Sequence, residues 1–186
     1  GAKKVLIIRV DFSDKTGTPV NQSDSQQITP AYATNVFTTA NGISDFYAQA
    51  SYGLTSLTLL SSDVTPVYRM PQTAAYYAQG NGTSAYNSTL HTDAENAATA
   101  GGYTLANYDR IGVVFSYLGG IASSKVTYAG LGDVQGTHFW INGYFDFRTC
   151  AHEIGHNYGL QHCNLWQVSD GNPVSPSGTS RSEEHT

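Results

Sequence analysis

The stretch from His152 to His162 constrains this chain more than any other, because it reads H-E-x-x-H-x-x-G-x-x-H. His152 and His156 are four residues apart, so on a helix they lie one turn apart on the same face. Gly159 is suited to end that helix, since glycine adopts the left-handed conformation of such a turn without steric cost. The chain can then turn back and bring His162 beside the other two histidines.

The three histidines of this stretch form a pattern of metal ligands. Two imidazoles one helical turn apart can bind one Zn²⁺, and His162 supplies a third nitrogen. Three protein ligands plus a water are typical of a catalytic zinc. Glu153 lies about 100° further round the helix, beside the metal, where it can accept a proton from a bound water. The pattern therefore predicts His152, His156 and His162 as zinc ligands and Glu153 as the general base. The alternative is a helix that carries its histidines for packing or solvation.

The motif resembles the zinc signature of the metzincin metallopeptidases. Residues 156–162 most resemble the gametolysin family, and residues 4–14 and 45–53 resemble that family or its immune-inhibitor-A-like relatives. The resemblance covers about residues 3–180, although only the zinc signature is specific. It implies a secreted zinc endopeptidase in which the two helix histidines and the third histidine hold the metal and the glutamate acts as the base.

The C-terminal part of the sequence departs from the metzincin pattern. Metzincins place a methionine in a tight turn beneath the metal, after the third histidine, whereas the only methionine here is Met70, which precedes the motif. The last six residues match the in-frame translation of a sequencing-library adapter. We therefore expect residues 1–180 to be a catalytic domain that is incomplete at its C-terminus, and residues 181–186 to be an artefact. The alternative is a genuine polar tail.

Length and composition narrow the class of protein. A chain of 186 residues fits one domain that can bury a core. Its net charge of −5 argues against nucleic acid as a partner, and no apolar run approaches the roughly 20 residues of a membrane span. Only 12% of the residues are charged, a composition that suits an extracellular protein. We expect a secreted enzyme whose partner is a protein or peptide substrate; the sequence does not indicate an oligomeric state.

Two cysteines, Cys150 and Cys163, flank the motif. They are either a disulfide that joins the two ends of the motif in an oxidising compartment or two buried free thiols. The sequence does not show whether their geometry allows a bond. A third interpretation makes Cys163 a zinc ligand in place of His162, although His162 already fits the spacing.

The rest of the chain predicts alternating strands and helices. Strands are expected at residues 5–12, 54–60, 65–70, 111–118, 126–129 and 137–142. Helices are expected at residues 32–39, 43–51, 83–100 and 147–158. Residues 164–180 are expected to form a loop, because they contain two prolines and two glycines. This order predicts an α/β fold: a metzincin-like catalytic domain with a mixed twisted sheet, packed helices and an active-site zinc helix.

Individual residues on these elements have expected roles. Ser44 and Asp146 are expected to be helix N-caps. Pro66 indicates an edge strand or a break in a strand. His91 is expected at the surface or as a capping residue, and His138 is expected to be an ordinary strand histidine that is not a ligand. The aromatic residues of the helix at residues 43–51 are expected to lie in the core.

Metal-assisted hydrolysis of a peptide bond in extracellular or matrix proteins is the function that this pattern favours. In the resembled fold, an edge strand within residues 119–136 pairs with the extended substrate. Two other functions remain: a non-catalytic zinc-bearing adhesion or matrix-binding module, and a zinc hydrolase of non-peptide substrates. Glu153 argues against the first, because a structural zinc site does not need a glutamate beside the metal. An extended cleft would favour a peptidase, and a closed pocket would favour the other hydrolase.

Overall fold

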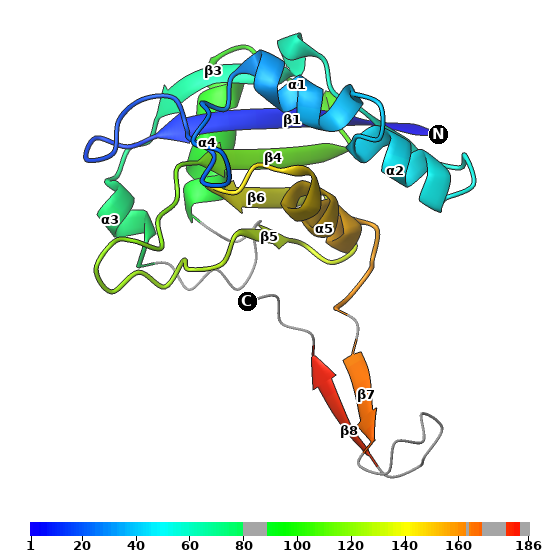
Figure 1. The fold of residues 1–186 in the computed structure, drawn as a ribbon. Helices are drawn as coiled ribbons and strands as arrows, with labels where there is room; N and C mark the ends of the chain where they lie inside the picture. Colours follow the sequence, from blue (N-terminus) through cyan, green and yellow to red (C-terminus); the bar gives the residue numbers. More distant parts are fainter. Residues whose placement is uncertain (80–88, 163, 169–177, 183–186) are drawn as a thin grey trace.

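The main sheet of the protein is mixed and has the strand order β2-β1-β4-β6-β5, with β3 also paired to β1 (Figure 1). The computed structural model describes residues 1–79, 89–162, 164–168 and 178–182. The strands are β1 (Ala2–Asp11), β2 (Ser56–Thr58), β3 (Val64–Arg69), β4 (Arg110–Phe115), β5 (Gly130–Gly132) and β6 (His138–Asn142). Every pair is parallel except β5 with β6. The α/β prediction is therefore confirmed.

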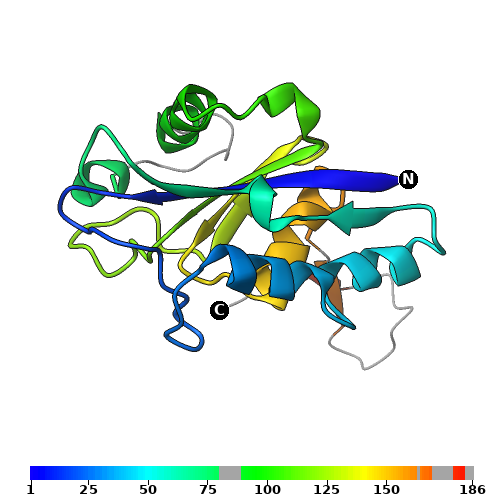
Figure 2. The ribbon, with the colours of Figure 1, turned by 90° about the horizontal axis from the view of Figure 1, so that it is seen from above.

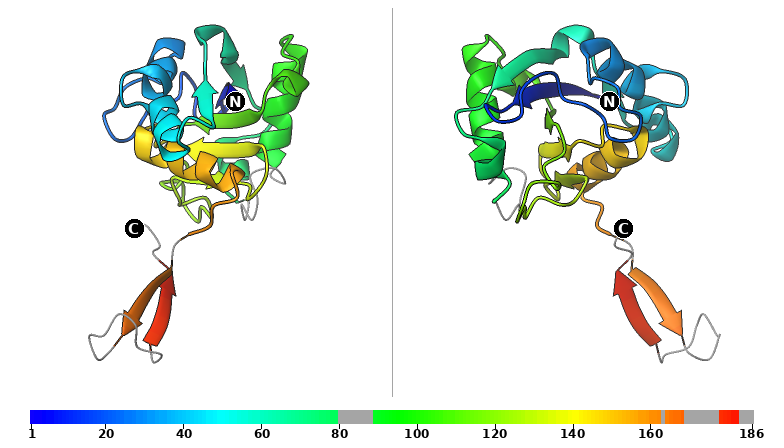
Figure 3. Two further views of the ribbon diagram at one scale, coloured as in Figure 1. Left: turned by 90° about the vertical axis from the view of Figure 1, so that its right-hand side faces the viewer. Right: turned by 60° about the vertical axis from the view of Figure 1, so that its left-hand side comes forward.

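Helices cover both faces of this sheet (Figure 2). One face carries α1 (Pro30–Thr38), α2 (Ile43–Ala50) and α5 (Phe147–Asn157), and the opposite face carries α4 (Thr89–Ala100). The short helices are α3 (Ala74–Tyr77), η1 (Ser61–Asp63) and η2 (Leu105–Asn107). Figure 3 shows from the side that helices lie on either side of the sheet. Among the described residues, every helix is too short or too polar for a membrane span.

The two faces bury separate hydrophobic clusters. The α4 core contains Leu6, Ile8, Val10, Phe12, Met70, Ala74, Tyr77, Ala78, Leu90, Ala94, Ala98, Ile111, Val113, Phe115, Leu118, Val126 and Trp140. The α5 core contains Val5, Ile7, Ile28, Ala33, Phe37, Ile43, Tyr47, Leu57, Leu59, Val64, Val114, Phe139, Ile141, Phe145, Cys150, Ala151 and Ile154. Strands β1, β4 and β6 contribute alternate residues to both cores, which explains the nearly continuous apolar runs of β1 and β4.

The edge strand beside α5 lies four residues later than predicted. No strand forms at residues 126–129; the strand is β5, and Gly130 pairs with Ile141. Val126 is apolar because its side chain is buried, although it lies in a loop. Its carbonyl oxygen accepts a hydrogen bond from the side-chain amide of Asn142 at 3.1 Å. The same amide donates to the carbonyl of Tyr128 at 2.8 Å. A buried side chain therefore takes the place of a strand ladder here.

Two predictions for α2 are wrong. The N-cap is Gly42, and the hydroxyl of Ser44 instead donates to the carbonyl oxygen of Leu57 at 2.7 Å, which ties α2 to β2. Phe46 is 43% exposed rather than in the core. Its ring meets that of Phe147 edge-on, with centroids 5.7 Å apart, so it packs against α5 from the surface.

Pro66 lies where its prediction placed it, on an edge strand at an irregularity. In the part of the chain that the structure describes, strand β3 pairs only with β1, and the register between them shifts between Ile7 and Arg9. The partners on either side of that shift are Val64 and Val67, so Pro66 falls within it. A residue without an N–H is tolerated there because no ladder hydrogen bond is required of it.

The prediction of a loop at residues 164–180 is wrong for residues 164–168 and 178–180, and its remainder lies outside the described residues. Strand β7 (Asn164–Val168) pairs antiparallel with β8 (Gly178–Ser182). Both prolines and Gly171 fall within residues 169–177, outside the described residues, whereas Gly178 begins β8. Residues 83–88 of the predicted helix before α4 also lie outside the described residues. The assignment of residues 181–186 to an artefact stays a prediction.

Candidate metal centre

Helix α5 carries the motif, and its two ends follow from the sequence. At the start, the carboxylate of Asp146 accepts a hydrogen bond from the N–H of Thr149 at 2.9 Å, which confirms the predicted N-cap. At the end, Tyr158 is the C-cap and Gly159 adopts φ +91°. A side chain at Gly159 would be strained in this left-handed conformation. The turn then directs the chain back toward the helix.

Helix α5 is held from its buried side by α2. The hydroxyl of Tyr47 donates to the carbonyl oxygen of Ala151 at 2.6 Å, one residue before His152. The rings of Tyr47 and Tyr158 lie with centroids 5.0 Å apart, and Ile154 is fully buried in the α5 core. These contacts fix the rotation of the helix and therefore the direction in which its histidines point.

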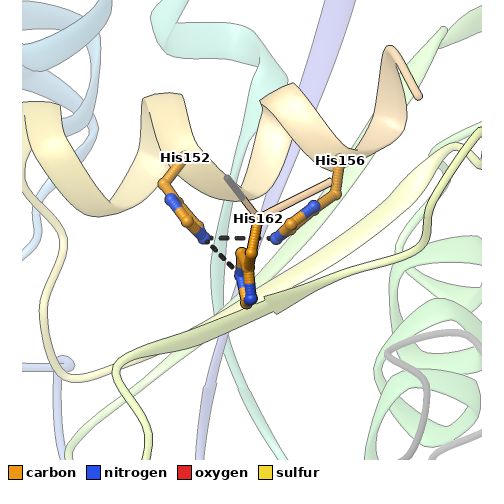
Figure 4. Close-up of side chains that lie close together, drawn as sticks. All are labelled: His152, His156 and His162. Carbon is orange, nitrogen blue, oxygen red and sulfur yellow. Dashed lines mark hydrogen bonds between the residues drawn. The ribbon is translucent and has the colours of Figure 1, made fainter. Parts of the chain in front are cut away.

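The three motif histidines converge on one point (Figure 4). The Nε2 atom of His152 lies 3.1 Å from that of His162 and 3.2 Å from that of His156. Two imidazole nitrogens bound at about 2.0–2.1 Å to one tetrahedral Zn²⁺ lie about 3.3–3.4 Å apart. The separations in the protein therefore come close to those of a zinc site.

The hydrogen bonding of His156 fixes which of its nitrogens can bind a metal. Its Nδ1 atom lies 2.8 Å from the carbonyl oxygen of Leu160, so Nδ1 carries the proton and Nε2 presents a lone pair. The Nε2 atom of His152 therefore faces two nitrogen atoms, the Nε2 of His156 with its lone pair and the Nε2 of His162. A proton on Nε2 of His152 can form a hydrogen bond to only one of them. A cation between the three nitrogens satisfies all of them.

The side chain of Glu153 lies under the edge strand β5, and the same strand packs against His156. Its side chain is 6% exposed, and burial raises the pKa of its carboxyl group to about 8, opposed by a hydrogen bond from the Gly132 backbone. A nearby divalent cation favours the ionised form, so bound metal acts against this effect of burial. A carboxyl group with such a raised pKa has the proton affinity that a general base near neutral pH requires.

Sequence reasoning missed the two glycines of β5, which lie against α5. A Cβ atom at Gly130 would lie 2.6 Å from Cγ of Glu153, and one at Gly132 would lie 2.3 Å from the carbonyl oxygen of Glu153. Only glycine permits this approach of strand and helix. The signal that could have revealed it is the spacing of two residues, which places both glycines on one face of a strand.

Met70 and Cys150 lie apart from the histidine cluster. Met70 is buried in the α4 core, on the opposite face of the sheet from α5, so it is not the methionine of a metzincin turn. Cys150 is fully buried in the α5 core, and this burial raises the pKa of its thiol well above the ordinary value. Cys163 lies outside the described residues. The disulfide with Cys150 and the alternative in which Cys163 binds zinc therefore stay predictions.

A second group of potential ligands consists of His91 and Glu95 on α4 and His138 on β6. The prediction that His91 lies at the surface is wrong, because its side chain is fully buried. It forms part of the layer between α4 and the sheet. The helical spacing of four residues between His91 and Glu95 is a signal that could have drawn attention to this group, but only the fold brings His138 to it.

The mixed sheet, the H-E-x-x-H helix and the third histidine after a glycine turn define a metzincin-type metallopeptidase. The sequence model of metallo-peptidase family M12 matches residues 6–184, and the chain belongs to this family. Membership implies a catalytic metal, usually zinc. Searches among curated proteins and among solved structures found no match.

Proposed function

We propose that this chain is the catalytic domain of a secreted, gametolysin-like zinc endopeptidase that acts on extracellular or matrix proteins. The observation that carries the proposal is the convergence of the Nε2 atoms of His152, His156 and His162 on one point, with the buried carboxyl group of Glu153 on the same helix. The gametolysin-like character rests on the sequence resemblance of residues 156–162, and secretion rests on that resemblance and on the composition.

The donor set fits Zn²⁺, which binds three neutral imidazoles and leaves a fourth position for water or substrate. His152 and His156 would hold the metal from the helix, and His162 would close the site from the turn after Gly159. The bound ion would polarise the peptide carbonyl group and acidify a water molecule. The contact from His156 to the Leu160 carbonyl would keep that imidazole in the tautomer that binds metal.

Glu153 would act as the general base. Its carboxylate would accept a proton from the attacking water as the water oxygen bonds to the carbonyl carbon of the substrate. The same carboxyl group would then give this proton to the nitrogen of the leaving amine as the peptide bond breaks. Burial beneath β5 suits this role, because it strengthens the affinity of the carboxylate for a proton. The backbone N–H of Gly132 would keep the carboxylate oriented between the two steps.

Strand β5 would align the substrate. It is the last strand in the order of the main sheet, and among the described residues no other strand pairs with its outer edge. An extended peptide can add to such an edge through main-chain hydrogen bonds. This edge favours a peptide substrate over a small non-peptide one, and the buried Glu153 favours a hydrolase over a non-catalytic zinc module.

The test compares hydrolysis and metal content in the zinc-loaded chain. We expect Glu153→Gln, and likewise Glu153→Ala, to lower kcat/KM on a protein or peptide substrate by about 10²–10⁴-fold while bound Zn²⁺ stays unchanged. Asp45→Asn, an exposed carboxylate on α2, is the matched control and should retain full activity. Near-normal hydrolysis by Glu153→Gln would show that this mechanism is wrong.

A further inference from the structure

The layer between α4 and the sheet contains a second cluster of metal-binding side chains. His91 and Glu95 lie one turn apart on α4, and His138 begins β6. One ligand atom from each lies within 4.8 Å of the others. The shortest contact is 3.0 Å, between Nε2 of His138 and Oε1 of Glu95, and Nδ1 of His91 lies 3.8 Å from the same oxygen. Three side chains from two elements therefore point at one volume.

This cluster is withdrawn from solvent. The side chain of His91 is fully buried, and those of Glu95 and His138 are 18% and 16% exposed. The two imidazole rings meet edge to face with centroids 4.9 Å apart. A buried carboxylate is costly unless a cation compensates its charge, and among the described residues Lys and Arg make no ion pair with Glu95. The partners that can compensate the charge of this largely buried carboxylate are therefore the histidines or a bound ion.

The second ring nitrogen of His138 also has polar neighbours. The hydroxyl oxygen of Thr137 lies 3.0 Å from Nδ1 of His138, and a carboxylate oxygen of Asp133 lies 3.9 Å from the same nitrogen. When the Nδ1 proton points to Thr137, Nε2 presents its lone pair toward the carboxylate of Glu95, and a cation can lie between them. When the Thr137 hydroxyl donates to Nδ1 instead, the Nε2 proton can bond to Glu95 without a metal. Hydrogen bonding at the second ring nitrogen is the arrangement that orients histidine ligands of metals.

We propose that His91, Glu95 and His138 bind a second Zn²⁺, on the face of the sheet opposite α5. Two imidazoles and one carboxylate form a donor set that Zn²⁺ binds in proteins. Burial favours the neutral form of His91, which is the form that binds a metal. The ion would join α4 to the start of β6, and it would carry no part of the proposed hydrolysis. The alternative is a protonated His138 that forms an ion pair with Glu95 without metal.

The test counts Zn²⁺ per chain after removal of metal with a chelator and dialysis against Zn²⁺ in excess. We expect two equivalents in the unaltered chain and one in Glu95→Gln, which keeps the size of the side chain and removes its charge. Asp45→Asn removes an exposed carboxylate on α2 and should retain both equivalents. Two equivalents in a folded Glu95→Gln chain would overturn the proposal.

A second experiment uses a variant that lacks the motif site, so that only the proposed second site can bind Zn²⁺. In a chain with His152→Ala and His156→Ala, we expect one equivalent of Zn²⁺ and a rise in Tm on its addition, both lost when Glu95→Gln is added. Co²⁺ should give the visible absorption of a histidine- and carboxylate-bound ion in the same background. If Glu95→Gln lowers Tm equally with and without Zn²⁺, the ion pair explains the cluster and the proposal is wrong. These counts do not depend on hydrolysis, so failure of the peptidase proposal would leave them unaffected.

Discussion

The side-chain amide of Asn157 donates a hydrogen bond to the main-chain carbonyl oxygen of His138, 2.9 Å away. The same amide donates to the carbonyl of Asp133 at 3.0 Å, and the N–H of Gln135 donates to the carbonyl of His156 at 2.9 Å. These bonds attach the connection between β5 and β6 to the end of α5. Because His138 and His156 belong to different histidine clusters, one short backbone segment supports both.

We predict that Asn157→Ala destabilises the protein by about 1–3 kcal/mol, because it leaves two partly buried carbonyl groups without this donor. Asn157 is 4% exposed, so water cannot readily replace it. The free energy of unfolding in urea measures the effect. Asn35→Ala, at an exposed position of α1, is the matched control and should change stability by less than about 0.5 kcal/mol. Equal effects of the two substitutions would show that the Asn157 bonds contribute nothing.

The close approach of β5 to α5 yields a second prediction. Gly132→Ala places a Cβ atom 2.3 Å from the carbonyl oxygen of Glu153, so strand or helix must move. We expect a loss of about 1–3 kcal/mol in stability and a fall in kcat/KM, because the Gly132 N–H no longer meets the Glu153 carboxylate. Gly120→Ala is the control, since nothing lies within 4 Å of a Cβ atom there. A Gly132→Ala chain with unchanged stability and activity would contradict this packing.

The site helix was predictable because its determinants are local. All of them lie within about four helical turns: the carboxylate of Asp146, the spacing of His152 and His156, and the glycine at position 159. The buried strands β1 and β4 were predictable for a similar reason, since their apolar runs mark strands covered on both faces.

The unpredicted features depend on contacts between distant segments. Strand β5 consists of Gly-Leu-Gly, which has no strand propensity, and it forms because it pairs with β6 and fits against α5. Burial of His91 depends on which side of α4 faces the sheet beside His138. The hydroxyl of Ser44 donates to the carbonyl oxygen of Leu57 instead of capping its own helix, and this bond depends on the position of β2.

His162 is the ligand that can be removed without disturbing the core, because it is exposed and follows the helix. We predict that His162→Ala weakens Zn²⁺ binding at this site at least about tenfold, since losing a ligand costs more than losing a residue that only hydrogen-bonds to a ligand. Stability of the metal-free chain should stay the same. Competition with a chromogenic chelator measures the affinity, and Gln161→Ala, at the exposed neighbouring position, is the control. Unchanged affinity in His162→Ala would remove this residue from the ligand set.

The hydroxyl of Tyr47 links α2 to the site helix, and Tyr47→Phe tests this link. Removing the hydroxyl leaves the Ala151 carbonyl without its 2.6 Å donor, so we expect a loss of about 1 kcal/mol in unfolding free energy. A lower kcat with bound Zn²⁺ unchanged would accompany it if the bond also sets the rotation of α5. Tyr76→Phe, at a half-exposed position of α3, is the control. Equal stability of the two variants would show that the bond is not stabilising.

Acid should weaken the fold in part through Asp11 at the end of β1. Arg69 forms two hydrogen bonds to its carboxylate, at 2.6 and 2.9 Å, and Gly17 donates a third at 2.7 Å. The hydrogen bond from Arg69, against the opposing effect of burial, lowers the pKa of Asp11 below its ordinary value of 3.8. The stabilisation is therefore complete above that ordinary value and is lost as pH falls through the lower folded-state pKa.

We predict that Asp11→Asn reduces the pH dependence of the unfolding free energy below about pH 4, by at most one proton per chain. Urea unfolding at a series of pH values measures this slope. Arg69→Gln should reduce the slope in the same way, because it removes the partner that lowers the pKa. The double variant should behave like Asp11→Asn alone, since the two substitutions remove one interaction. Additive changes in slope would show that Arg69 acts on some other acidic group.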